Sequence, residues 1–104
     1  MLNSQRIVKL MPLAEGDLDD IYDYLCGFSL EIGEKYFNLL LDELFELETN
    51  ADTYLYCRDE RLRQEKVKWK LVNNYMIFFT IHDEENIVLI RRILYSRRNY
   101  NDMI

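Results

Sequence analysis

The chain has 104 residues, which is enough for one folded domain but not for two. Its two cysteines, Cys26 and Cys57, are too few for a disulfide framework and lack metal-ligand spacing, so they fit a reducing cytosol. No segment has the run of about 18 apolar residues that a membrane span needs, and the N-terminus lacks the apolar stretch of a signal peptide. We therefore expect a cytoplasmic protein that is neither secreted nor embedded in a membrane.

The net charge of −6 argues against general nucleic-acid binding, but the charge is unevenly distributed. Residues 1–50 contain three basic and eleven acidic side chains, whereas residues 51–104 contain ten and eight. All ten of these basic side chains lie in segments 58–70 and 91–98, which together contain only three acidic ones. The two segments would form a basic patch if they meet in space, unless the chain's own carboxylates pair with them.

A helical hairpin is predicted to follow a short first strand. Residues 7–10 read as the strand, and Pro12, whose fixed φ suits a first helical turn, begins an amphipathic helix that ends at Gly27. Ser29 is placed to cap a second amphipathic helix that runs to about Glu48. The connection is short, so we expect the helices to be antiparallel neighbours.

From about residue 65 onward, apolar and basic residues alternate as in a half-buried strand. The alternating residues are Val67, Trp69 and Leu71 on one side and Lys66, Lys68 and Lys70 on the other. Successive side chains of a strand point to opposite faces. We therefore expect the apolar side to cover the helices and the three ammonium groups to point into solvent.

Two more strands complete the predicted sheet. Residues 73–74 are two asparagines that suit a tight turn, and residues 75–81 return as an apolar strand. After a turn at 83–86, residues 87–94 are apolar enough to form a central strand that is covered on both faces. The predicted fold class is α+β, with an antiparallel helical hairpin packed on a mainly antiparallel meander sheet of about four strands. A short C-terminal helix is expected from about Arg98.

Three segments carry a resemblance to a known family. They are residues 8–25 (VKLMPLAEGDLDDIYDYL), 71–79 (LVNNYMIFF) and 90–100 (IRRILYSRRNY). In this order and spacing they resemble the RelE/ParE superfamily of toxins from bacterial type II toxin–antitoxin modules. The resemblance implies that the whole chain is one toxin domain, silenced by an antitoxin that is usually encoded beside it.

The resemblance leaves two activities open. RelE-like members cut mRNA in the ribosomal A site, whereas ParE-like members poison DNA gyrase and are not nucleases. Cutting RNA requires loss of the 2′-OH proton, stabilisation of the phosphorane's charge and protonation of the leaving 5′-oxygen, all of which crowded lysines and arginines can provide. Two lysines alternate along the second strand of RelE-like nucleases, and Lys68 and Lys70 match those positions.

Two departures from the family pattern bear on this activity. Met76 stands where RelE-like nucleases usually have an active-site arginine, and Tyr95 stands where a histidine often follows the Ile-Leu pair. Arg97, Arg98 and either Tyr95 or Tyr100 could substitute, with a ring stacking on a base and a guanidinium holding phosphate. The residues favour RNA cleavage slightly over gyrase poisoning. A third alternative is a catalytically inactive toxin that binds its antitoxin and acts as a co-repressor.

The predicted site is metal-independent and needs no cofactor. Its catalytic residues are Lys68, Lys70, Arg97 and Tyr95. Its RNA- or phosphate-binding residues are Arg61, Arg63, Lys66, Arg92, Arg98 and Tyr100. Arg92 could instead pair with a helix carboxylate. We expect Trp69 and most tyrosines, including Tyr36 and Tyr75, to be packing residues.

The implied partner is a cognate antitoxin in a toxin–antitoxin hetero-oligomer. The target is the ribosome and its mRNA, or DNA gyrase in the alternative, and no membrane is involved. An antitoxin segment would fold on the toxin as a helix on apolar surface or as a strand at a sheet edge. We expect an acidic stretch of the antitoxin to neutralise segments 58–70 and 91–98.

Overall fold

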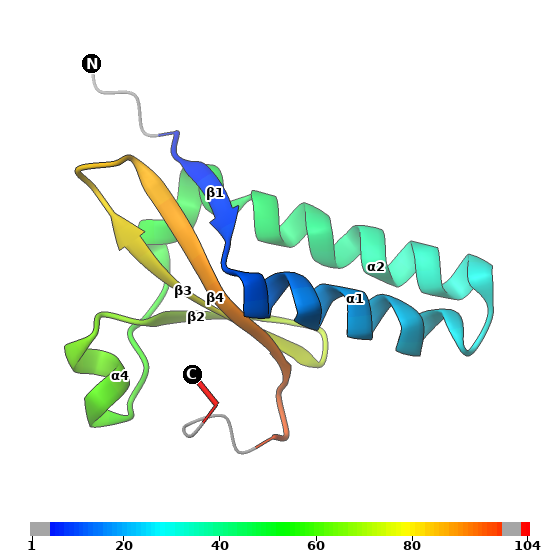
Figure 1. Cartoon of the computed structure of the whole chain (residues 1–104). Coiled ribbons are helices and arrows are strands. Elements are labelled where there is room, and N and C mark those ends of the chain that lie inside the picture. The colour runs from blue at the N-terminus through cyan, green and yellow to red at the C-terminus, as the bar shows by residue number, and fades with distance from the viewer. Residues whose placement is uncertain (1–4, 99–102) are drawn as a thin grey trace.

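The structure is a computed structural model that describes residues 5–98, 103 and 104. It is an α+β fold in which a helical hairpin lies on one face of a sheet (Figure 1). The elements in chain order are β1 (Ile7–Leu10), α1 (Pro12–Cys26), α2 (Leu30–Phe45), α3 (Leu47–Asn50), the 3₁₀ helix η1 (Ala51–Thr53), α4 (Glu60–Gln64), β2 (Lys68–Val72), β3 (Tyr75–His82) and β4 (Ile87–Tyr95).

Within the described residues, the sheet has four strands in the order β1-β4-β3-β2. The last three strands form the predicted antiparallel meander, and β1 pairs in parallel with β4. The central position predicted for β4 is therefore confirmed, since it lies between β1 and β3. The pairing between β3 and β4 has one irregularity, a register shift between Phe78 and Phe79.

The helices of the hairpin begin where their terminal residues predict, but α2 ends at Phe45 and not at about Glu48, and the short helix α3 follows it. Pro12 begins α1, and the Ser29 hydroxyl accepts a hydrogen bond from the Ile32 N–H at 3.0 Å, which caps α2. The two helices approach closely at Gly33, where a Cβ would lie 2.6 Å from the Cys26 Sγ. Glycine is therefore required for the observed crossing of α1 and α2, because any side chain would push the helices apart.

Two apolar clusters lie on opposite faces of the sheet. The larger cluster joins α1 and α2 to the sheet and includes Leu40, Leu44, Ile77 and Phe79. The smaller cluster joins α4 to the other face and includes Leu62, Val67, Phe78 and Leu94, with Trp69 and Met103 packed against it. Figure 1 shows α4 and the chain end on the side of the sheet away from the helical hairpin. Both faces of the sheet are thus apolar.

The predicted orientation of β2 is wrong. Lys70 pairs with Ile77 of the larger cluster, so Lys68 and Lys70 face the helices and are 9% and 3% exposed. Trp69 packs on the opposite face, and Leu71 is 53% exposed. The alternation identified a strand, but an apolar cluster on each face makes alternation alone insufficient to assign the solvent side.

Helix α4 was not predicted, although its ends carry recognisable signals. The Asp59 side chain accepts a hydrogen bond from the Leu62 N–H at 3.1 Å and caps the first turn. At the other end the Val67 N–H donates to the Leu62 carbonyl and the Lys66 N–H to the Arg63 carbonyl, both at 2.9 Å. These two bonds form a Schellman motif, in which Lys66 takes a φ of 62° that glycine usually adopts.

The C-terminal part of the prediction cannot be compared directly. The helix expected from about Arg98 falls mainly on residues 99–102, which lie outside the described part of the chain, as does Tyr100. Arg98 itself donates its N–H to the Tyr95 carbonyl at 3.0 Å. Among the described residues, no helix is long and apolar enough to cross a membrane.

Candidate functional site

The two basic segments meet, which is the condition for a basic patch, but a carboxylate lies between them. Glu65 accepts from the Arg61 guanidinium at 3.1 Å and from the Arg91 guanidinium at 3.3 Å, which joins α4 to β4. Arg61 also donates to the Ile104 carbonyl at 3.1 Å. Two of the basic side chains in these segments thus share one carboxylate of the chain itself.

Arg92 is held still more firmly, by Asp17 of α1. The guanidinium binds both carboxylate oxygens, with Nε at 2.8 Å and an Nη at 2.9 Å, and it also donates to the Met103 carbonyl at 2.8 Å. Asp17 accepts a further bond from the Ile93 N–H at 2.9 Å. The hydrogen bond to Asp17 raises the pKa of Arg92. The alternative of pairing with a helix carboxylate is therefore the one found for Arg92.

Lys70 is buried beneath the end of α2. Its ammonium donates to the Glu43 carbonyl at 2.6 Å and pairs with the Glu43 and Glu46 carboxylates at 3.2 and 3.4 Å. Burial alone would lower the pKa of Lys70, but hydrogen bonds with Tyr54 and Glu43 raise it overall. A lysine in this environment stays protonated and holds the last turn of α2 to the sheet.

Lys68 is held at the outer corner of the sheet. Its ammonium donates to the Tyr54 carbonyl at 2.6 Å and lies 4.2 Å from the centre of the Tyr56 ring. A hollow of about 320 Å³ opens here, lined by Lys68, Tyr56 and Lys66 together with two aspartates. Those aspartates, Asp52 and Asp83, both pair with Arg6.

The predicted catalytic residues are not gathered at one point. Lys68 is level with Phe79 and Ile90 across the sheet, whereas Tyr95 lies opposite Tyr75 at the other end of β4. Five residues of strand separate these levels, which is about 16 Å along β4. Arg97 is exposed and follows β4, so it is also far from Lys68.

A smaller set of cations is available at the surface. These are the exposed side chains of Arg58, Arg63, Lys66, Arg97 and Arg98, for which residues 5–98, 103 and 104 provide no ion pair. The predicted antitoxin contact through segments 58–70 and 91–98 stays a prediction. It would rest on these five side chains more than on Arg61 or Arg92.

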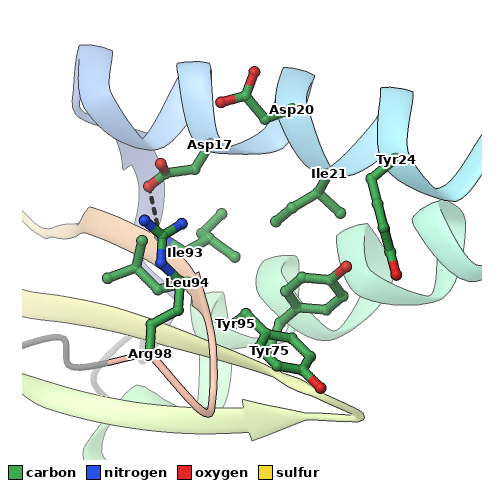
Figure 2. Close-up of a pocket in the computed structure, with 9 residues that line it drawn as sticks. All are labelled: Asp17, Asp20, Ile21, Tyr24, Tyr75, Ile93, Leu94, Tyr95 and Arg98. Atoms are coloured by element: carbon green, nitrogen blue, oxygen red, sulfur yellow. Dashed lines mark hydrogen bonds between the residues drawn. The ribbon is translucent and has the colours of Figure 1, made fainter.

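A tyrosine-lined groove was missed by the sequence analysis. One hollow of about 460 Å³ lies between α1 and the end of β4, and Figure 2 shows Tyr24, Tyr75, Tyr95 and Arg98 around it. A second hollow of about 530 Å³ shares the three tyrosines and continues along α2 to the β2–β3 turn. Tyr36, expected in the core, lines this second hollow and is 43% exposed.

The rings at the centre of the groove are packed against each other. Tyr75 and Tyr95 meet edge to face with centroids 6.1 Å apart. Burial is the main cause of a raised pKa for Tyr75, so its hydroxyl stays neutral and can donate a hydrogen bond. The sequence did contain a signal for this groove, because Tyr24 lies among the acidic residues of the first helix. An aromatic residue on a solvent-facing side of a helix suggests a contact surface.

Comparison with known proteins identifies the family to which a chain with this fold belongs. Residues 8–100 match the family model described as ParE toxin of the type II toxin–antitoxin system parDE, so the chain belongs to this family. It is thus a RelE/ParE superfamily toxin of a type II toxin–antitoxin module, and its partner is an antitoxin. No curated protein sequence matches the chain.

Two solved structures share the fold. A chain of the chromosomal ParDE toxin–antitoxin system from P. aeruginosa is 18% identical and superposes with a TM-score of 0.74, covering 91% of this chain and 100% of its own. A chain of the RelBE2 toxin–antitoxin complex from Mycobacterium tuberculosis is 16% identical with a TM-score of 0.64, covering 88% and 98%. At these identities the likeness concerns the fold alone.

Proposed function

We propose that this toxin arrests growth by binding DNA gyrase and that it does not cut RNA. The observation that supports the proposal is the position of Lys68 and Lys70, which face the helices and are held by protein oxygens. The family model, which is that of a ParE toxin, agrees with this choice. The slight preference for RNA cleavage that the sequence suggested rested on the match of these lysines to the second-strand lysines of RelE-like nucleases, on a strand face that was expected to be exposed.

The chemistry of RNA cleavage gives the physical reason. A general base must be able to lose its proton near neutral pH and must reach the 2′-OH. Lys70 is 3% exposed with a raised pKa, so it meets neither condition in this conformation. Arg92, on the central strand β4, already binds Asp17 through two nitrogens and would have to leave that pair to hold a phosphorane.

Induced expression in a bacterial host tests the proposal. We expect growth arrest with induction of a DNA-damage reporter, no primer-extension stops within translated messages, and inhibition of purified gyrase by the purified toxin. Toxin-dependent stops in frame with translation would contradict it and establish RNA cleavage. Normal growth at a confirmed level of folded toxin would contradict it in favour of an inactive toxin that binds its antitoxin as a co-repressor.

RNA cleavage is the second candidate, because one observation favours it. Lys68, Lys66 and Tyr56 line the corner hollow, where two ammonium groups and a ring could hold a phosphate and a base. Substituting Lys66→Ala and Lys68→Gln should abolish arrest if this candidate is correct. Under the gyrase proposal the same variant keeps its toxicity, provided that its thermal unfolding matches the wild type.

A further inference from the structure

A hollow between the two helices of the hairpin, separate from the tyrosine-lined groove, brings two carboxylates and two rings together. It has a volume of about 530 Å³ and is lined by Asp19, Tyr22 and Asp23 of α1 and by Phe37 of α2. The two rings meet edge to face with centroids 5.0 Å apart. Asp19 and Asp23 are four positions apart, so they are neighbours on one face of α1. The hollow therefore offers negative charge and aromatic surface at one place.

The carboxylates of this hollow are uncompensated. Both are exposed, and the described residues provide neither of them with an ion pair. Lys35, the one basic side chain of α1 and α2, lies with its ammonium 5.6 Å from the centre of the Tyr36 ring. The two carboxylates belong to a set of seven exposed acidic side chains on these helices that lack an ion pair within the described part of the chain: Glu15, Asp19, Asp20, Asp23, Glu31, Glu34 and Asp42.

The negative charge extends to the ring of Tyr22. The interaction with the Cys26 thiol is the main cause of a raised pKa for Tyr22, and the carboxylates of Glu34 and Asp23 raise it further. A potential that disfavours a second anion stabilises a cation at the same place. The face of an aromatic ring also attracts cations.

The fold shows elsewhere how such a set of groups holds a cation. The ammonium of Lys70 lies 3.2 and 3.4 Å from the carboxylates of Glu43 and Glu46, and 5.3 Å from the centre of the Tyr54 ring. Those two carboxylates are three positions apart at the end of α2. The hollow repeats this combination of neighbouring carboxylates and aromatic surface, but it opens to solvent and receives no cation from the described residues.

We propose that this hollow receives a lysine or arginine side chain from a basic segment of the antitoxin. Charge complementarity selects a cationic occupant, and the antitoxin is the partner of toxins in this family. A second copy of the toxin is disfavoured, because two chains with a net charge of −6 repel each other. The contact would lie apart from segments 58–70 and 91–98, where an acidic stretch of the antitoxin is predicted. The inference is the same whether the toxin acts on gyrase or on RNA.

Binding of the full-length toxin to the purified antitoxin, the product of the gene beside that of the toxin, tests this inference with three variants. The first, Asp19→Asn with Asp23→Asn, removes both charges and keeps the shape of the side chains. The second, Tyr22→Leu, removes one ring. The matched control, Glu15→Gln with Asp42→Asn, removes two exposed charges of the same helices outside the hollow. Circular dichroism establishes that each variant melts like the wild type.

The expected results distinguish the hollow from the general charge of the hairpin. The Asp19→Asn with Asp23→Asn variant should bind the antitoxin at least about tenfold more weakly at low salt and lose less at high salt, since salt screens exposed charges. Tyr22→Leu should weaken binding by about threefold to fivefold at either salt concentration, because contact with a ring acts at short range. The control should bind within about twofold of the wild type at both.

A scan of the antitoxin then identifies the occupant. Each lysine and arginine of the antitoxin is changed to alanine, and binding is measured to the wild-type toxin and to the Asp19→Asn with Asp23→Asn variant. One basic residue should lose affinity for the wild type and lose almost none for the variant, since the two changes remove the same contact.

Three results would overturn the inference, and none of them depends on whether gyrase is the target. Equal binding of the antitoxin by the wild type and by the variant without Asp19 and Asp23 would show that the hollow is not a contact. Effects that add for every lysine and arginine of the antitoxin would show that no cation of the antitoxin occupies it. Retained antitoxin binding with a loss confined to gyrase binding would assign the hollow to the target.

Discussion

The basic side and the helical hairpin of this toxin differ in how their charges are compensated. On the basic side, Glu65 binds Arg61 and Arg91, and Asp17 binds Arg92, so part of a cluster that is dense in sequence is satisfied within the fold. On the hairpin, seven acidic side chains have no such partner among the described residues. The segment with the most conspicuous charge is therefore not the one that offers most charge to a partner.

The comparison is tested most severely at Asp17. Asp17→Ala would leave Arg92, whose side chain is 15% exposed, without its two-point partner and the Ile93 N–H without its acceptor. Breaking a buried pair from one side costs about 3 kcal/mol in the free energy of unfolding. Urea denaturation, monitored by tryptophan fluorescence, measures this loss in the free energy of unfolding.

Asp20→Ala is the matched control for that prediction. Asp20 lies on the same helix but is exposed and has no ion pair among residues 5–98, 103 and 104. Its removal should change the free energy of unfolding by less than about 0.5 kcal/mol. If Asp17→Ala and Asp20→Ala lower the free energy of unfolding equally, the ion pair between Asp17 and Arg92 contributes little to stability.

A second substitution tests the buried cation at the end of α2. Lys70→Met keeps an unbranched side chain of similar length up to the ammonium group but removes the bonds to Glu43 and Glu46. We expect a loss of about 2 kcal/mol in the free energy of unfolding, since charge-assisted hydrogen bonds disappear while the two carboxylates return to water. Thermal and urea unfolding measure the loss.

The pH dependence of this loss follows from the raised pKa of Lys70. A group whose pKa is higher in the folded state contributes its full stability below the unfolded value, here 10.5, and loses it as the pH rises through the folded value. The wild type should therefore keep its advantage over Lys70→Met from neutral pH to about 10.5 and lose it above. A constant difference across that range and beyond would contradict the assigned protonation.

A third substitution concerns Lys66, on the exposed part of the basic side, and a smaller effect is expected there than at Asp17 or Lys70. Lys66→Gly places glycine at a φ of 62°, which a lysine adopts only with strain. The free energy of unfolding should rise by about 1 kcal/mol, because Lys66 occupies the left-handed position of the Schellman motif. Lys66→Ala is the control, since alanine has the same Cβ strain and should not stabilise the protein.

Much of the fold could be predicted from the sequence because its local signals agree with one another. Pro12 and Ser29 begin their helices where expected, and the turn at Asn73 has the positive φ of 52° that asparagine tolerates. The parallel pairing of β1 with β4 was not predicted, since it joins residues about eighty positions apart and no local pattern specifies it. The prediction of which face of β2 is exposed was wrong because both faces of the sheet are covered.

The candidate site was less predictable, for a different reason. Charge counting identified Arg92 but not its partner, because Asp17 lies 75 positions away and on a helix that looks merely acidic. The groove was missed because Tyr24, Tyr75 and Tyr95 come from three separate elements, each of which could have buried its ring. Only the packing of α1 against the end of β4 brings the three rings to one surface.

The short bridge between Tyr56 and Lys68 has a consequence for how the toxin behaves at high concentration. Through it, the Trp69 N–H donates to the Leu55 carbonyl and the Cys57 N–H to the Val67 carbonyl, which occupies the first half of the outer edge of β2. At the other edge, the Arg6 N–H donates to the Glu48 carbonyl beside β1. An open strand edge invites pairing with a second copy and, from there, aggregation. With part of each edge occupied by its own chain, less of the sheet is open to pairing with a second copy.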